Sequence, residues 1–222
     1  MPSPRPISSL RALTVALVLT SLLALPTAAQ DYEAQVQALM ADPSVQMAMD
    51  HIEATDEQTM ADLRMLTQIP APPFMEEERG RAFLARLQEI GVDSAWVDEV
   101  GNVIGQRRGT GGGEVLAIAG HLDTVFPEVT DVAITQRGDT LFAPGIADDT
   151  RGLATILAVL RAMNEAGVRT AGDILFIGNV GEEGVGDLRG MKHLFREGGP
   201  RIDAFISVDG TGHHGITHMG LG

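Results

Sequence analysis

The chain contains no cysteine, and this absence excludes several kinds of chemistry. Without a cysteine among its 222 residues, the protein can form no disulfide bond, no thiol nucleophile and no cysteine-ligated zinc site. Attachment of a lipid to an N-terminal cysteine is excluded for the same reason. The chemistry of this chain must therefore come from other side chains.

Positive charge is also scarce. The chain has 16 Lys+Arg against 30 Asp+Glu, for a formal net charge of −14, and Lys192 is its one lysine. Such an acidic surface repels phosphate backbones, so we expect no nucleic-acid partner. The run Gly111–Gly113 lacks the trailing Lys-Ser/Thr of a phosphate-binding loop, and we interpret it as a surface turn.

The N-terminus has the pattern of a secretory signal. Arg5 and Arg11 form a basic region, Ala12–Leu25 an apolar run too short to span a bilayer with ordinary flanks, and Thr27–Ala29 a small-residue cleavage site. We therefore predict a signal peptide over residues 1–29, no stable membrane anchor, and export to a periplasmic or extracellular location. An uncleaved membrane anchor is the alternative interpretation.

The next part of the chain has helical periodicity. Residues 30–68 are polar-rich with apolar residues three and four positions apart, which predicts a helical N-terminal segment. Thr55 and Gln58 are spaced as in a capping box, which predicts that a helix begins there and ends before Pro70. Met75–Ile90 predicts an amphipathic helix that ends at Gly91.

After Gly91 the pattern alternates between strands and helices. Unbroken apolar runs such as Ile174–Ile177, separated by helices, indicate parallel strands that are covered on both faces. The predicted fold class is therefore α/β, with a mostly parallel or mixed sheet and helices on both faces. The expected strands are Val92–Val97, Val103–Gln106, Val115–Ala119, Asp173–Val180 and Ala204–Val208, with a hairpin of Val132–Thr135 and Thr140–Phe142; the expected helices are Asp149–Ala166 and Leu188–Phe195.

Four clusters of acids and histidine share one position relative to this sheet. The segment His121–Asp123, the pair Glu182–Glu183 and Asp209 each follow a predicted strand, and Asp148–Asp149 opens the long helix. Ligands bind at the carboxyl ends of the strands in an open parallel sheet, and these ends lie along one edge. We therefore expect the four clusters to meet there.

These residue types suit a hydrolytic metal site. Taken alone, each cluster could be an ordinary surface feature, a turn or a helix N-terminus. Together they require a cation, because close carboxylates repel one another unless positive charge lies among them. One imidazole with several carboxylates suits Zn²⁺, Co²⁺ or Mn²⁺. Of two adjacent glutamates, one can bind metal while the other moves a proton.

The motifs resemble those of a known family. His121-Leu122-Asp123-Thr124-Val125, Gly145-Ile146-Ala147-Asp148-Asp149, Gly181-Glu182-Glu183-Gly184 and Val208-Asp209-Gly210 are similar, in this order, to the co-catalytic di-zinc metallopeptidases of peptidase family M20. This family includes peptidase T, glutamate carboxypeptidase, aminoacylase and succinyl-diaminopimelate desuccinylase. The resemblance extends from about residue 56 to 212.

The resemblance implies a role for each motif residue. Asp148 would bridge two Zn²⁺ ions. His121 and Asp209 would bind the first ion and Glu183 the second. Asp123 would orient His121, and Glu182 would be the general base that removes a proton from the bridging water. The implied substrates are short peptides or N-acyl amino acids, cleaved at the amide bond.

The chain departs from the family pattern in two ways. Thr150-Arg151 follows the Asp pair, where members often carry Lys. The family also has a lid or dimerisation domain after the Asp209 region and a later zinc-binding histidine. We therefore expect residues 69–212 to be the first part of a catalytic domain, and residues 213–222 to begin a lid through which a homodimer could form. The isolated chain would then be inactive or impaired, because the last zinc ligand is missing; His213, His214 and His218 are weak candidates to replace it.

Two other interpretations remain open at this point. The related zinc aminopeptidase family shares the bridging aspartate and the glutamate pair. A non-catalytic exported module that binds metal or peptide could have retained the fold without the chemistry. The intact Glu182 favours an enzyme, because a binding protein has little use for a general base.

Overall fold

The computed structural model describes residues 32–210. The predicted signal peptide and His213, His214 and His218 lie outside the described residues. The helices are α1 (Tyr32–Met40), α2 (Pro43–Ala54), α3 (Asp56–Thr67), α4 (Glu77–Ile90), α5 (Thr150–Glu165) and α6 (Arg189–Leu194), with a short 3-10 turn at Gly184–Gly186. The strands are β1 (Ser94–Val97), β2 (Val103–Arg107), β3 (Leu116–His121), β4 (Thr135–Arg137), β5 (Thr140–Phe142), β6 (Ile174–Asn179) and β7 (Ala204–Ser207).

The main sheet is mixed, with strand order β1-β2-β6-β3-β7. Strands β6, β3 and β7 are parallel, while β2 pairs with β6 and β1 with β2 in the antiparallel direction. Every residue of the central strand β6 is buried, as the unbroken apolar run Ile174–Ile177 within it predicts. The α/β class with a mixed sheet is thereby confirmed.

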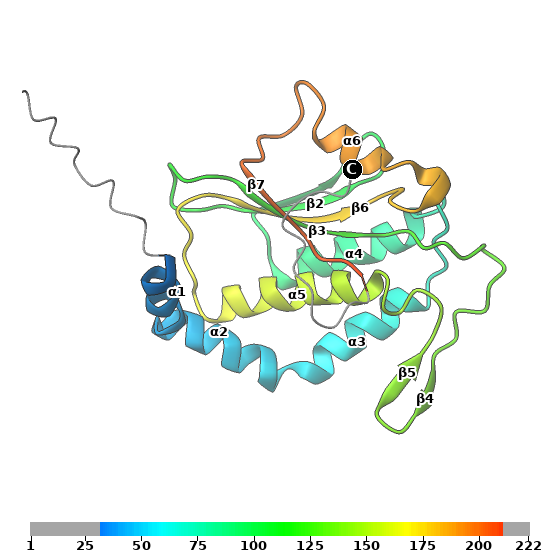
Figure 1. Cartoon of the computed structure of the whole chain (residues 1–222), viewed down its shortest axis with the longest axis horizontal. Helices are drawn as coiled ribbons and strands as arrows, with labels where there is room; N and C mark the ends of the chain where they lie inside the picture. The colour runs from blue at the N-terminus through cyan, green and yellow to red at the C-terminus, as the bar shows by residue number, and fades with distance from the viewer. Residues whose placement is uncertain (1–31, 211–222) are drawn as a thin grey trace, which may run out of the picture.

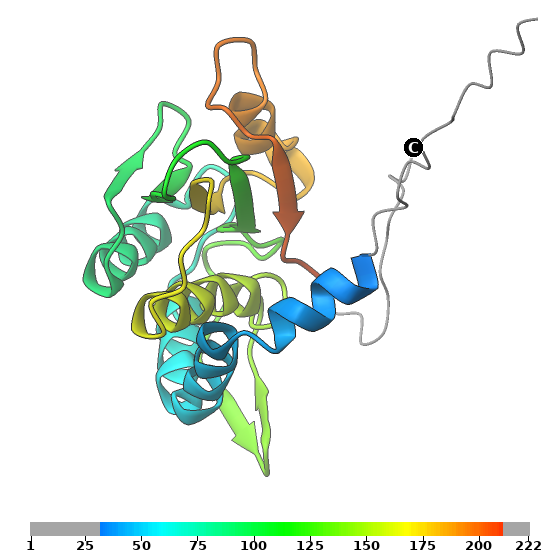
Figure 2. The same cartoon turned by 90° about the vertical axis from the view of Figure 1, so that its left-hand side faces the viewer.

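Helices cover both faces of this sheet, but unequally. Helices α4 and α5 pack on one face, with α2 and α3 outside α5, whereas the short helix α6 covers the other face (Figures 1 and 2). The larger core lies on the α4–α5 side, because long amphipathic helices bury more apolar area. Its buried residues are Leu66, Phe83, Leu87, Val103, Leu122, Leu153, Ile156, Leu157, Leu160, Ile174, Phe176 and Val180.

The prediction of a capping box at Thr55 is wrong. Thr55 does precede α3, but it has φ −113° and ψ 23°, and its side chain does not cap that helix. Its hydroxyl instead donates to the carbonyl of His51 at 2.7 Å, one turn back in α2. Thr55 is therefore both the last capping residue of α2 and the residue before α3. Its hydrogen bond to α2 keeps its hydroxyl away from the backbone amides of α3.

The hairpin is also shifted from its expected position. Strand β4 begins at Thr135 rather than Val132, and Thr135 pairs with Phe142. The carboxylate of Asp131 accepts the backbone N–H of Ala133 at 2.9 Å, a local turn that competes with strand pairing. Among residues 32–210, no helix is long and apolar enough to cross a membrane.

Candidate metal centre

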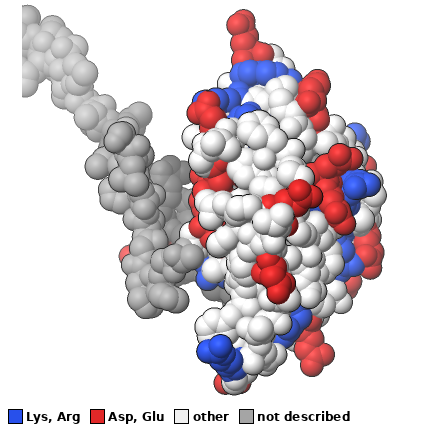
Figure 3. Space-filling view, turned by 90° about the vertical axis from the view of Figure 1, so that its right-hand side faces the viewer, with Lys and Arg blue, Asp and Glu red and all other residues white. Residues whose placement is uncertain are grey.

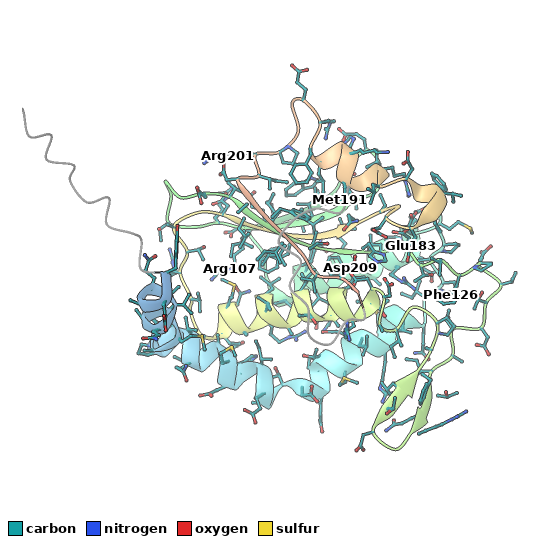
Figure 4. The ribbon with its side chains drawn as sticks, viewed as in Figure 1. Arg107, Phe126, Glu183, Met191, Arg201 and Asp209 are labelled. Atoms are coloured by element: carbon teal, nitrogen blue, oxygen red, sulfur yellow. The ribbon has the colours of Figure 1, made fainter. Side chains whose placement is uncertain are left out.

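The predicted convergence of acids and histidine is present in the structure. His121 ends β3, Glu183 lies beyond the end of β6, Asp209 lies beyond β7, and Asp148 lies just before α5. Two sets of ligand atoms lie within 4.8 Å of one another: those of His121, Asp148 and Glu183, and those of His121, Asp149 and Asp209. In Figure 4, Glu183 and Asp209 lie toward the carboxyl ends of the parallel strands, whereas Arg107 lies toward the other end of the sheet.

His121 lies at the centre of this cluster. Its side chain is 2% exposed, and its Nε2 is 2.9 Å from Asp148 Oδ1 and 3.6 Å from Asp209 Oδ1. The side chains of these two aspartates are 45% and 41% exposed. One buried imidazole nitrogen therefore faces two carboxylates at the solvent boundary, where an ion and a substrate could reach them.

Asp123, which the resemblance places beside His121, contacts it mainly through the backbone. The backbone carbonyl of Asp123 lies 2.9 Å from His121 Nδ1, while its nearer carboxylate oxygen is 3.7 Å away. The carboxylate accepts the backbone N–H groups of Glu182 and Glu183, at 3.0 and 2.8 Å. A single residue at the end of β3 thus holds the imidazole and the glutamate pair together.

Asp149 belongs to the same cluster, although the sequence reasoning assigned it no role. It is 1% exposed, and its two oxygens accept the backbone N–H groups of His121, at 2.9 Å, and Gly152, at 3.1 Å. It therefore caps α5 and holds the end of β3 in place; the peptide bond joining it to Asp148 is cis. The signal in the sequence was an aspartate at a helix N-terminus, a feature that is common without any ligand.

The electrostatics of the cluster favour positive charge. Burial alone would lower the pKa of His121, but its hydrogen bond to Asp123 and the charges of Asp149, Asp123 and Asp209 raise that pKa to about 10. Burial raises the pKa of Asp149 to about 7 and also raises the pKa values of Glu182 and Glu183, with neighbouring acids adding to each rise. The ionised forms of these acids are therefore disfavoured when the acids lie close together without a cation.

The donor set fits divalent metal ions. One imidazole nitrogen and several carboxylate oxygens are available, the set that suits Zn²⁺, Co²⁺ or Mn²⁺. Within the described part of the chain, neither lysine nor arginine forms an ion pair with Asp148, Glu183 or Asp209. His121 is the basic side chain that faces Asp148 and Asp209 in the described residues, and one imidazole cannot balance several carboxylates, so a divalent cation would supply the missing positive charge.

The remaining described histidines lie away from this edge. His193, on α6, is 2.8 Å from Glu99, and His51 is a half-buried residue of α2. On the face shown in Figure 3, acidic side chains form several separate patches with basic ones between them, and most of the surface belongs to uncharged residues. A cavity of about 640 Å³, lined by Arg107 and Arg169 among others, lies at the other end of the sheet, away from the acids and His121.

The comparisons with known proteins agree with this geometry. Residues 117–221 match the model of peptidase family M20/M25/M40. The chain belongs to this family. The matched region includes His121, Asp148, Glu183 and Asp209, which converge at the carboxyl ends of the parallel strands.

Individual relatives support the M20 assignment. A Pyrococcus abyssi protein provisionally named LysW-lysine/LysW-ornithine hydrolase is 32% identical over 166 residues, which is 75% of this chain and 44% of the relative. Carboxypeptidase G2 of a Pseudomonas species is 35% identical over 112 residues, 50% of this chain and 26% of that protein. The aminopeptidase PepT from Bacillus cereus superposes with a TM-score of 0.60 and 25% identity, covering 70% of this chain and 44% of PepT. The chain thus spans less than half the length of each of these relatives.

Proposed function

We propose that this chain carries the metal-binding part of the active site of an exported hydrolase that cleaves amide bonds in short peptides or N-acyl amino acids. The observation that carries the proposal is the meeting of His121, Asp148, Glu183 and Asp209, from segments far apart in the chain, around one buried imidazole nitrogen. The relatives named a hydrolase, a carboxypeptidase and an aminopeptidase support the same reaction class.

The ligand atoms suit a pair of ions. His121 and Asp209 would hold one zinc ion and Glu183 the other, with Asp148 placed to contact both, because its carboxylate lies near both His121 and Glu183. When bound, zinc lowers the pKa of water and polarises a substrate carbonyl. The partial exposure of Asp148 and Asp209 leaves this edge open to a substrate.

Glu182 has the properties of a general base. It lies next to Glu183, its backbone N–H is held by Asp123, and burial raises its pKa above the ordinary glutamate value. A raised pKa brings a carboxylate closer to the operating pH and improves its ability both to take and to return a proton. Glu182 would accept a proton from the attacking water and pass it to the leaving amine.

The test of this function combines metal analysis with hydrolysis assays. We expect zinc to bind the chain by elemental analysis, and slow hydrolysis of a member of a dipeptide and N-acyl amino acid panel, in keeping with the impaired activity that the sequence predicts. Glu182→Gln should keep the metal but lower the rate by about 10²-fold or more, because it removes the proton acceptor. Two bound ions with no turnover would favour the non-catalytic binding module, and a chain that binds no metal would contradict both functions.

Substitution of the predicted bridging residue tests the ligand set. Asp148→Asn should weaken Zn²⁺ binding by more than about tenfold in titration calorimetry, because a neutral amide replaces a charged ligand. Asp139→Asn, at the tip of the hairpin, removes the same charge far from the site and should leave the affinity unchanged. Equal affinity for both variants would remove Asp148 from the metal site.

A further inference from the structure

The turn that carries the two glutamates is held by side chains instead of by the sheet. Residues 180–183 present four consecutive backbone N–H groups, and each donates to a side-chain oxygen. In chain order the acceptors are Asn102, Glu76 and the two carboxylate oxygens of Asp123, at 3.0, 3.1, 3.0 and 2.8 Å. Asn102 and Asp123 are fully buried and Glu76 is 3% exposed. The path of the chain into Glu182 is therefore determined by three buried polar groups.

Glu76 is the unexpected member of this set. It immediately precedes α4, where an acidic side chain commonly caps its own helix, yet Glu76 makes no such bond. Its carboxylate reaches instead to a distant part of the chain: Oε1 accepts the N–H of Gly181, and Oε2 accepts Arg189 Nη2 at 2.7 Å. The carboxylate thus links the start of α4 to the turn after β6.

Arg189 compensates the buried charge of Glu76 and packs against the backbone of Gly181. A buried carboxylate is costly unless it is paired and hydrogen-bonded. The guanidinium of Arg189 provides that pair, and it also stacks on the ring of Phe74, 4.5 Å from the ring centre. Gly181 has φ +64°, and a Cβ at this position would lie 2.0 Å from Arg189 Nη1. The turn therefore leaves space for glycine alone under the guanidinium.

We propose that Glu76, held by Arg189, is a positioning residue for the turn of residues 180–183, which carries Glu182 and Glu183. By fixing the N–H of Gly181 it sets the peptide group between Val180 and Gly181, one residue before Glu182, and so directs Glu182 and Glu183 toward His121 and Asp148. The carboxylate of Asp123 accepts the next two backbone N–H groups, those of Glu182 and Glu183. The carboxylates of Glu76 and Asp123 therefore hold adjacent parts of one turn. The consequence for metal binding rests on the proposed function, whereas the effect on the turn itself does not.

The test measures the turn directly in the full chain without metal. Hydrogen exchange followed by NMR should show protection at residues 180–183, although they lie beyond the end of β6. In Glu76→Gln the Gly181 amide should exchange at least about tenfold faster, because Gly181 and Arg189 each donate to a different carboxylate oxygen and the amide NH2 would face one of these two donors. Zn²⁺ affinity should fall by a similar factor through displacement of Glu183.

A matched control and a second variant keep the test decisive. Glu78→Gln removes the same charge from an exposed position in the first turn of α4 and should change neither quantity. If Glu76→Gln does not fold, Glu76→Gln/Arg189→Gln removes both charges of the pair together, and the same amide should again lose its protection. Unchanged exchange at Gly181 in a folded variant would overturn the proposal; faster exchange in a chain that binds no zinc would support the positioning role while contradicting the proposed function.

Discussion

At the residue scale, the structure gives the predicted site residues more specific contacts than their spacing could indicate. Asp123 holds His121 with its backbone carbonyl and uses its carboxylate for the amides of Glu182 and Glu183. Asp149 supports the backbone of His121 from the N-terminus of α5. An acid two residues from a histidine, or at a helix start, indicates proximity but not which atoms meet, because this depends on side-chain and backbone torsions.

Gly152 offers a test of this local packing. It lies in the first turn of α5, where alanine would ordinarily stabilise the helix by about 1 kcal/mol relative to glycine. Here a Cβ would lie 2.1 Å from Asp149 Oδ1, so Gly152→Ala should instead lower the free energy of unfolding by about 1–3 kcal/mol, as measured by urea denaturation. Gly80→Ala in α4, whose nearest neighbour is a Val103 methyl at 3.3 Å, should be milder. A stabilised Gly152→Ala would show that Asp149 is free to move.

At the element scale, the elements with strong periodicity were predicted well. The sequence placed α4 and α5 within two residues of their observed bounds, and Gly91 ends α4 with φ +100°. The predictions failed where a local motif competes with its neighbours. Thr55 bonds backward to α2 instead of forward to α3, and the Asp131 turn delays β4. Such choices depend on the adjoining element, which a short sequence window does not contain.

The packing of α3, α4 and α5 contains a buried charge cluster that provides a second test. Asp62 of α3, with its side chain 3% exposed, lies 2.8 Å from Arg86 of α4 and 2.6 Å from Arg161 of α5. Asp62→Asn should lower the free energy of unfolding by about 3–5 kcal/mol, because it leaves the mostly buried guanidinium of Arg161 without its acid partner and that of Arg86 with only the exposed Glu89. Urea denaturation measures this loss. Glu57→Gln on the exposed face of α3 serves as the control, and equal stability of the two variants would show that the cluster contributes little.

At the scale of the whole molecule, the order of the strands brings the site together. Strand β6, late in the chain, lies between β2 and β3, so the turn after β6 meets the ends of β3 and β7. Ions bound to ligands from all three segments should therefore stabilise the entire fold. With free zinc at about 100 times Kd, each ion should add about 2.7 kcal/mol to the free energy of unfolding.

Thermal unfolding checks this linkage. The melting temperature should rise with Zn²⁺ and return to its starting value after chelation, while Mg²⁺, which prefers all-oxygen octahedral sites, should have a smaller effect. An unchanged melting temperature at saturating zinc would mean that the ion binds the folded and unfolded chains equally. That result would contradict a site assembled by the fold.

Export of the molecule stays a prediction from its N-terminal sequence, in residues that the structure does not describe. Expressed in a Gram-negative bacterium, the chain should appear in the periplasm with Gln30 as its first residue, because the basic, apolar and small-residue regions match a cleaved signal. N-terminal mass spectrometry of the periplasmic fraction checks this. A chain without residues 1–29 is the control and should stay in the cytoplasm; an intact Met1 on the exported protein would contradict cleavage.

The sequence by itself determined the α/β class, most helix and strand positions, and the identity of the acids and the histidine at the strand ends, because periodicity and motif spacing are local properties. Only the tertiary structure decided the strand order, the role of Asp149, and the contacts that Asn102, Glu76 and Asp123 make with the turn of residues 180–183. These contacts join groups up to 105 residues apart. Their partners are chosen by the packing of helices on the sheet, and no periodicity along the chain encodes that choice.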